Sequence, residues 1–296
     1  MLTSPTHSLK TLAWLARIAL GLVVAAWLLF GASWVALHWV IVPRIAQWQP
    51  DIERLASQRL GVEVRIGQIV LDGSTAVPSF TLTDVRLLDA QERPALHLPK
   101  VHAALSVSSI WRLGFEQLVI DSPVLDVRRT ANGQWQLGGL NLDLNDPTIT
   151  NTGALDWVLG QRELAVLNGT LRYTDETKPE APPLVLSNIR WVNRFYKQSL
   201  HMRLDAQLPE GWGDQVSVQG AFKLPIWVRG AGNWQEWEGE WFTLAPQVDL
   251  KRLSVYADTT SVLGLHLLEG AGGARAWADM RDGQLRNITL DMGLRA

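Results

Sequence analysis

Apolar and polar residues alternate along most of the chain after Val62, which is the period of a β-strand that buries one face. The alternation is clearest at Leu200–Leu208 and Val216–Leu224. Asn132-Gly133 stands between two further stretches and is a dipeptide typical of a tight hairpin turn. Helical patterns are few, at 154–161 and 260–268. The body of the chain is therefore predicted to be mainly β, with few short helices.

One eight-residue pattern occurs three times, beginning at Phe80, Leu96 and Leu184, with apolar residues at its first, third, sixth and eighth positions. Between the third and sixth positions the alternation slips by one residue, which would turn the apolar face over. A β-bulge corrects this, because one extra residue keeps all four apolar side chains on one face. We therefore expect a long twisted, bulged antiparallel sheet with one apolar face.

An apolar sheet face needs a cover. The sheet can close as a sandwich or barrel, receive helices, or remain a groove that an apolar ligand occupies. The alternation of residues does not choose between these arrangements.

The 25 residues from Ile18 to Val42 carry no formal charge. The apolar region of a secretory signal peptide has about 7–15 residues, so this longer run predicts an uncleaved transmembrane helix. Lys10 and Arg17 precede it without nearby acids, so the positive-inside rule places the N-terminus in the cytoplasm. The predicted membrane-interface anchors are Trp14, Trp39 and Trp48.

The expected domain organisation has four parts. Residues 1–43 form a cytoplasmic stub and the transmembrane anchor, and residues 44–61 form a juxtamembrane helix that begins near Pro50 and stops at Gly61. Residues 62–150 form a first periplasmic β unit. Residues 151–296 form a second, which we expect to continue in a longer chain.

Composition argues against several classes of function. The 27 basic and 29 acidic residues leave a net charge of −2, which lacks the basic footprint of a nucleic-acid binder. The absence of cysteine excludes disulfides, thiolate metal sites and a cysteine nucleophile. The six histidines have no metal-ligand spacing, and neither a Gly-x-Ser-x-Gly elbow nor a P-loop is present. We predict no catalytic residue, no metal site and no cofactor, hence a protein that is not an enzyme.

Tryptophan is unusually frequent, with 15 residues. Four of them, Trp227, Trp234, Trp237 and Trp241, lie within fifteen residues of one another. Packing in a β core is the favoured interpretation, and lining a path for acyl chains is the alternative.

Several segments occur in an order that is similar to one known family. They are Gly61–Ile69, Pro78–Asp89, Ser108–Leu113, Leu118–Arg129, Leu155–Gln161, Leu167–Asp175, Ala181–Leu186, Trp237–Trp241 and Gly270–Trp277. In this order they resemble the N-terminal part of the AsmA-like family, most closely its large YhdP-type members. The resemblance implies one continuous strand through Asn168-Gly169, a dipeptide that on its own indicates a hairpin turn.

The resemblance implies a function that the residues alone do not supply. Family members are inner-membrane-anchored periplasmic proteins that are implicated in moving phospholipid toward the outer membrane along a β groove. The implied partners are phospholipid, the inner membrane and proteins of either membrane. The alternative is a non-enzymatic periplasmic scaffold or outer-membrane assembly factor with a closed β core. The candidate groove residues, assigned by pattern, are Phe80, Leu82, Val85, Leu87, Leu184, Leu186, Ile189 and Trp191.

Overall fold

A computed structural model describes most of the chain. The described residues are 6–36, 39, 47, 49–60, 62–72, 79–88, 94–106, 109, 114–137, 140–142, 157–226, 231, 236–256, 270–282 and 284–295. The chain divides into two compact units, Met1–Gln47 and Trp48–Ala296. The predicted boundary between two β units, at residue 150, lies outside the described residues.

The first unit contains one long helix, α1 (Thr6–Ala36). Its apolar section, Trp14–Val35, has 22 residues with a mean hydropathy of 2.2, and none of it is buried. At 1.5 Å per residue this section is about 33 Å long, enough to cross the hydrocarbon core of a bilayer. Trp14 and Trp39 are 63% and 81% exposed, like most of the unit around them, and Trp48 lies outside the described residues, so the interfacial role of the three stays a prediction. The helix therefore fits the predicted single-pass anchor.

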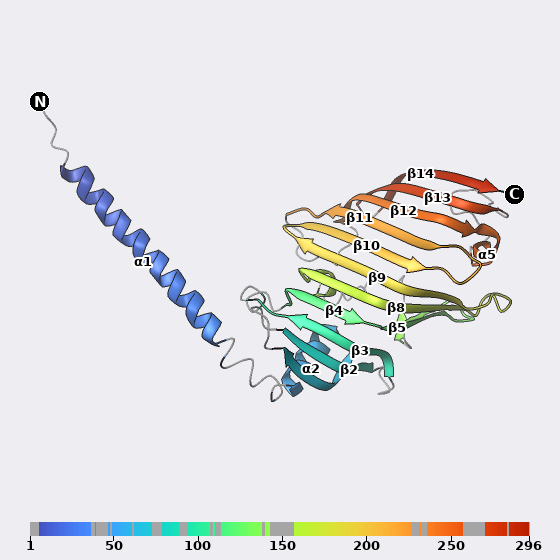
Figure 1. Ribbon diagram of the computed structural model, residues 1–296, viewed down its shortest axis with the longest axis horizontal. Helices are drawn as coiled ribbons and strands as arrows, with labels where there is room; N and C mark the ends of the chain where they lie inside the picture. Colours follow the sequence, from blue (N-terminus) through green and yellow to red (C-terminus); the bar gives the residue numbers. More distant parts are fainter. Residues whose placement is uncertain are drawn as a thin grey trace, which may run out of the picture. The chain divides into compact units, whose positions relative to one another are not determined.

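The second unit is dominated by a 14-stranded sheet (Figure 1). A helix, α2 (Gln49–Leu60), precedes the sheet, and a short helix, α5 (Leu250–Ser254), lies between two of its strands. The strands are β1 (Glu63–Asp72), β2 (Ser79–Leu88), β3 (Pro94–Ala104), β4 (Gln117–Asp121), β5 (Val124–Arg129), β6 (Trp135–Leu137), β7 (Leu140–Leu142), β8 (Glu163–Asp175), β9 (Leu184–Tyr196), β10 (Ser199–Gln207), β11 (Gln215–Lys223), β12 (Glu238–Asp249), β13 (Ala271–Arg281) and β14 (Gln284–Arg295). The predicted mainly β body is confirmed.

The sheet runs from β1 at one edge to β14 at the other, and most neighbouring strands are antiparallel (Figure 1). The exception is a parallel seam, where β4 and β5 lie end to end along one side of β8. The sheet is therefore mixed and not wholly antiparallel. The long connection between β5 and β8 supplies the length that a parallel crossover requires.

The predicted bulges are present. In β2 and β9 the extra residues are Asp84 and Asn188, with φ angles of 56° and 49°. Both lie in the left-handed region, which Asn and Asp enter more readily than most residues. The apolar residues on either side of each bulge consequently share one face of the sheet. We call this side the apolar face and the opposite side the polar face.

The irregularities line up from strand to strand. Ser122 falls between the pairs Lys100↔Asp121 and His97↔Val124, and Asn168 faces it across the parallel seam. Together the irregular positions form a line across the sheet, the crease, which consists of Gly67, Asp84, Pro99, Ser122, Asn168 and Asn188. Because adjacent strands carry the extra residue at the same level, their register is kept across the crease. Between β8 and β9 two opposite shifts on either side of Gly169 cancel, whereas the shift between β9 and β10 remains, because β10 has no extra residue.

The two Asn-Gly dipeptides behave differently. Asn132-Gly133 lies in the turn of the β5–β6 hairpin, and Gly133 has φ 79°. Asn168-Gly169 lies inside β8, which continues through it as the family resemblance implied. Asn168 has φ 54°, so it takes a turn-like conformation within a paired strand. The predicted helix at 154–161 is helical over the described residues 157–159, and 260–268 lies outside the described residues.

Helix α2 satisfies the free edge of β1 with polar side chains at a four-residue spacing. Gln49 Nε2 donates a 2.6 Å hydrogen bond to the Ile66 carbonyl, and Glu53 Oε1 accepts one of 2.7 Å from the Ile66 amide. Ser57 Oγ accepts a 2.9 Å hydrogen bond from the Val64 amide. Unpaired amides at a strand edge can form hydrogen bonds with a strand of another molecule. Because α2 occupies these amides, it protects this edge of the sheet from such pairing.

Candidate functional site

An uninterrupted row of cross-strand neighbours crosses the apolar face from the first strand to the last. In order from β1 to β14, the row consists of Ile69, Leu82, Val101, Ile120, Val166, Trp191, Leu204, Val218, Thr243, Ala276 and Leu290. All members except Thr243 are apolar. Eleven strands at about 4.8 Å spacing make this apolar row about 48 Å long.

Exposure to solvent increases along the apolar row. Leu82 and Val101 are buried, whereas Trp191 and Leu204 are half-buried and Leu290 is 39% exposed. The row is thus closed at the first strands and accessible toward the last.

All eight predicted groove residues lie on the apolar face. On β2, Phe80, Leu82 and Val85 are at most 8% exposed, and Leu87 is half-buried. The four on β9, which are Leu184, Leu186, Ile189 and Trp191, are half-buried. The prediction that these residues share one face is therefore confirmed. On that face, the residues of β2 are mostly buried and those of β9 are partly exposed to solvent. Binding of lipid by these residues stays a prediction.

A cover of aromatic residues explains the burial at β2. The ring of Phe115 lies 5.9 Å from that of Phe80, and Trp157 packs on Phe115 at 6.0 Å. Gln161 holds this cover in place, because its Oε1 accepts a 2.6 Å hydrogen bond from the Phe115 amide and its Nε2 donates to the Trp157 carbonyl. The apolar face is a closed core at this position.

Two further clusters close the ends of the later strands. At one end, Trp237 packs on Phe222 with ring centres 5.0 Å apart and donates a 3.0 Å hydrogen bond to the Ala231 carbonyl. At the other end, Val248 belongs to a cluster with Leu208 and Ala245. Between these clusters lie the half-buried centres of β9, β10 and β11, so the accessible part of the apolar face is a strip that runs across the strands.

A chain of aromatic rings borders the second of these ends. Trp135 stacks on Tyr173 at 5.8 Å, Tyr173 lies 5.9 Å from Tyr256, and Tyr256 lies 5.8 Å from Trp212. The Tyr256 hydroxyl donates to the Pro182 carbonyl, and burial raises the pKa of Tyr256. These rings pack on one another, as the favoured interpretation of the tryptophans predicted.

The polar face is charged and largely ion-paired. Arg203 donates to Asp205 through Nε at 2.8 Å and Nη2 at 3.1 Å, and Ser217 Oγ donates to the same carboxylate at 2.6 Å. The Arg203 guanidinium thereby holds the pKa of Asp205 below its usual value, with Ser217 contributing. A hollow of about 680 Å³ lies beside this pair.

Within the part of the chain that the structure describes, no group of three or more His, Cys, Asp or Glu residues could hold a metal ion. The absence of a metal site from the whole chain stays a prediction. His97 Nε2 lies 2.9 Å from Asp84 Oδ1, and His102 Nδ1 lies 2.9 Å from Thr81 Oγ1. Both histidines thus contact side chains of the neighbouring strand, which is a structural arrangement.

The predicted groove residues all belong to the repeated motif, whereas other members of the apolar row lie outside it. Leu204 is the cross-strand neighbour of Trp191, and Val218 is the next residue of the row on the same face. Their signal was available in the plain alternation of Leu200–Leu208 and Val216–Leu224. Leu290 lies in β14, where Ile288, Leu290, Met292 and Leu294 alternate in the same way, although most of this strand is exposed.

The comparisons agree with this architecture. The family model described as YhdP protein matches residues 1–296. Searches of curated proteins and of solved structures found no match. An apolar N-terminal helix, a long bulged sheet and a match over the full sequence lead to one conclusion: the chain belongs to the YhdP family.

Proposed function

We propose that this protein is an inner-membrane-anchored periplasmic carrier that holds phospholipid on the apolar face of its sheet. The observation that carries the proposal is the apolar row, which crosses eleven strands, is buried on β1 to β3, half-buried from β4 onward and exposed at β14. Acyl chains would lie on the strip that includes Leu186, Ile189 and Trp191, while the headgroup stays in water. Family membership supports the same function.

Burial of apolar surface is the force that would hold the lipid. Each CH₂ group moved out of water contributes about 0.8 kcal/mol. The same group gains little when it leaves a bilayer, because it is already out of water there. The protein would therefore lower the barrier to transfer without driving it, and net transport between the inner and outer membranes would need a lipid gradient or a protein partner in one of the membranes. No catalytic step is involved.

The location rests on the anchor and its flanking charges. Lys10 and Arg17 precede the apolar section of α1 or lie near its start, which favours a cytoplasmic N-terminus by the positive-inside rule. The sheet would then lie in the periplasm, between the two membranes that exchange lipid.

A second candidate function is a periplasmic scaffold or outer-membrane assembly factor with a closed β core. The specific observation in its favour is the cover over β2, where Phe115 and Trp157 bury Phe80. In this case the half-buried strip on β9–β11 would contact protein and not lipid.

The two functions differ in bound lipid. We would purify three versions of the full chain in a mild nonionic detergent: the unaltered protein, Leu186→Glu and Val185→Glu. Phospholipid extracted from each would be identified and quantified by mass spectrometry. Leu186 and Val185 are neighbours on opposite faces of β9. The carrier predicts lipid in the unaltered protein and in Val185→Glu, and its loss in Leu186→Glu with the β circular dichroism retained. A lipid-free unaltered protein, or equal lipid in both variants, would favour the scaffold.

A further inference from the structure

The hollow on the polar face is formed by short side chains between long ones. Its floor is β11, where Ala221 has His201 of β10 and Glu240 of β12 as its cross-strand neighbours. The volume of about 680 Å³ is in the range of sites for small organic ligands. It lies on the face opposite to the apolar row.

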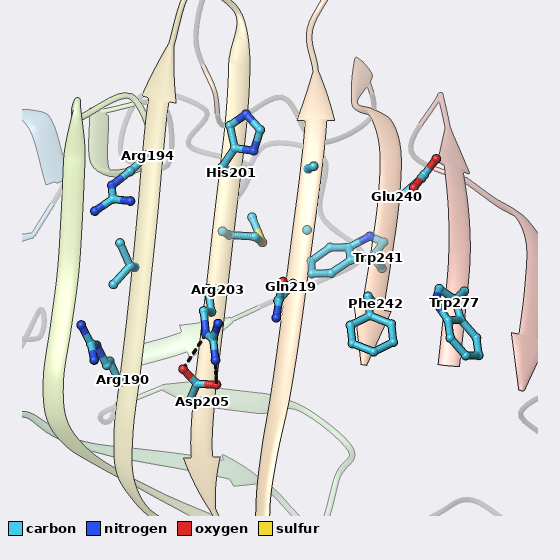
Figure 2. A pocket seen from close by; sticks show the side chains of 14 residues that line it. Arg190, Arg194, His201, Arg203, Asp205, Gln219, Glu240, Trp241, Phe242 and Trp277 are labelled. Atoms are coloured by element: carbon cyan, nitrogen blue, oxygen red, sulfur yellow. Dashed lines mark hydrogen bonds and ion pairs between the residues drawn. The ribbon is translucent and has the colours of Figure 1, made fainter. Parts of the chain in front are cut away.

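One side of the hollow is basic. Figure 2 shows Arg190 and Arg194 on β9 and Arg203 on β10, together at this side. The carboxylate of Asp205 compensates Arg203, and Arg194 donates only its Nε, at 2.7 Å, to Glu163. Within the described part of the chain, the exposed Arg190 has no ion-pair or hydrogen-bond partner. The basic side therefore retains donors for an anion.

The other side of the hollow is aromatic. Phe242 of β12 and Trp277 of β13 have ring centres 5.4 Å apart and lie opposite the arginines (Figure 2). Trp277 is 41% exposed, although it lies on the polar face. Arg203, Gln219, Phe242 and Trp277 are successive cross-strand neighbours, so the basic and aromatic sides share one row. An exposed indole beside arginines offers a flat apolar surface for a ring of the ligand.

We propose that this hollow binds a small organic anion that carries a planar apolar group. The anionic group, a phosphate monoester or carboxylate, would contact Arg190 and the free amino groups of Arg194, because Arg forks bind such oxygens in pairs. The planar group would lie against Trp277 and Phe242. Strands β9 and β12 are three spacings apart, about 14 Å, and the long arginine side chains shorten this span to the length of a small aromatic anion.

The charges of the lining favour an anion over a cation. Three arginines face two carboxylates, and the Asp205 carboxylate is already hydrogen-bonded to Arg203 and Ser217. Glu240 lies at the β12 corner, beside Ala221 and away from Arg190. A cationic ligand at this side would be repelled by Arg190. An anionic ligand at the same place would be attracted by Arg190 and would be separated from the negative charge of Glu240 by the width of the hollow.

The test is isothermal titration calorimetry of the full chain in nonionic detergent, with 2-naphthyl phosphate as the probe. Arg190→Gln and Trp277→Ala should each raise the Kd at least about tenfold, since each removes one of the two anchoring groups. The matched control is Arg172→Gln, an exposed arginine of β8 on the same face but outside the hollow, which should leave the Kd unchanged. Far-UV circular dichroism checks the fold of each variant.

Three further probes separate charge from ring. Inorganic phosphate carries only the charge, 2-naphthol only the ring, and 2-naphthylmethylamine the ring with the opposite charge. Each should bind at least about tenfold more weakly than 2-naphthyl phosphate. The proposal is overturned if 2-naphthyl phosphate gives no binding heat up to millimolar concentration, if 2-naphthol binds as tightly, or if Arg190→Gln and Arg172→Gln behave alike. The lipid content of the same preparations reports on the opposite face and stays unchanged in either case.

Discussion

Asn168 Nδ2 donates a 3.0 Å hydrogen bond to Asp121 Oδ1 across the parallel seam between β8 and β4. Ser122 Oγ donates to the same oxygen at 3.0 Å. Ser122 and Asn168 both have φ 54°, so the Asp121 carboxylate links two of the left-handed residues of the crease. These two hydrogen bonds, from Asn168 first and then Ser122, hold the pKa of Asp121 below its usual value. One carboxylate therefore stabilises the point where the pairing of strands changes from antiparallel to parallel.

The backbone at Asn168 predicts a difference between two substitutions. Asn168→Ala should lower the free energy of unfolding by about 1–2 kcal/mol, because a left-handed conformation is unfavourable for alanine. Asn168→Gly loses the same side-chain hydrogen bond but accepts the φ angle, so it should cost less. Urea denaturation followed by circular dichroism measures both. Equal losses of stability in the two variants would mean that the left-handed conformation at position 168 does not determine the cost of replacing Asn168.

Close packing of the backbone predicts that two strand glycines respond differently to alanine. A Cβ on Gly239 would lie 2.0 Å from the Ala221 carbonyl oxygen, whereas a Cβ on Gly293 would meet nothing within 4 Å. Gly239→Ala should therefore cost about 1–3 kcal/mol, the usual range for overpacking. Gly293→Ala is the matched control and should change stability by less than about 0.5 kcal/mol. Thermal unfolding of both variants decides, and a neutral Gly239→Ala would argue against the β11–β12 register.

The polar contacts of α2 predict protection of β1. In the double variant Glu53→Ala, Ser57→Ala the amides of Val64 and Ile66 lose their acceptors. Hydrogen exchange of the β1 peptide should become faster, measured by mass spectrometry. The chain should also self-associate more at high concentration, because the strand edge is uncovered.

The control for α2 is Arg54→Ala. Arg54 pairs with Asp51 on the exposed side of the same helix, at 3.1 Å. It should leave exchange in β1 unchanged. If Arg54→Ala accelerates exchange as much as the double variant does, general loss of the helix and not the edge contacts accounts for the effect.

The environment of Asp175 predicts a dependence of stability on pH. Burial raises the pKa of Asp175, but hydrogen bonds from the Thr177 hydroxyl and amide and from Tyr173, with Arg129 nearby, bring it below the usual value. A carboxyl with a lowered folded pKa stabilises the fold above its unfolded value of about 3.9. This stabilisation is lost as the pH falls below about 4 and through the folded value.

Asp175→Asn tests this dependence. At pH 6 the variant should be about 1–3 kcal/mol less stable than the unaltered protein, because a buried hydrogen-bonded carboxylate is replaced. The difference should shrink as the pH is lowered from 5 to 2 in urea titrations. Asp126→Asn, at an exposed position of β5, is the control and should show no such trend. A difference that stays constant with pH would contradict the assignment.

The parts of the fold that were predictable from sequence depend on local pattern. A bulge between Leu82 and Val85, and another between Leu186 and Ile189, were predicted because apolar side chains of a strand alternate with a period of two, and a slip of one residue is visible in the sequence itself. The shared face of Phe80 and Leu186 follows from the same rule. The burial of Phe80 on that face could not be predicted from the alternation, because the residues that cover it, Phe115 and Trp157, lie outside the strands.

The features that were missed depend on residues far apart in sequence. The parallel seam pairs Leu118 with Leu164, and no local pattern distinguishes this partner from another strand. On α2 the apolar Leu55 is 48% exposed, whereas the polar residues Gln49 and Ser57 make the contacts with β1. The hollow on the polar face likewise needs five strands, β9 to β13, in register before its two sides meet.

The most direct test of lipid binding on the apolar face uses two positions on opposite sides of the Asn188 bulge. Ile189 is half-buried on the apolar face, and Ser187, two residues earlier, is exposed on the polar face. We would place the photoreactive residue p-benzoylphenylalanine at each position of the full chain in living cells, irradiate, and detect phospholipid adducts by mass spectrometry. Lipid carriage predicts adducts at Ile189 and none at Ser187. Adducts at neither position, or equally at both, would contradict a lipid-binding apolar face.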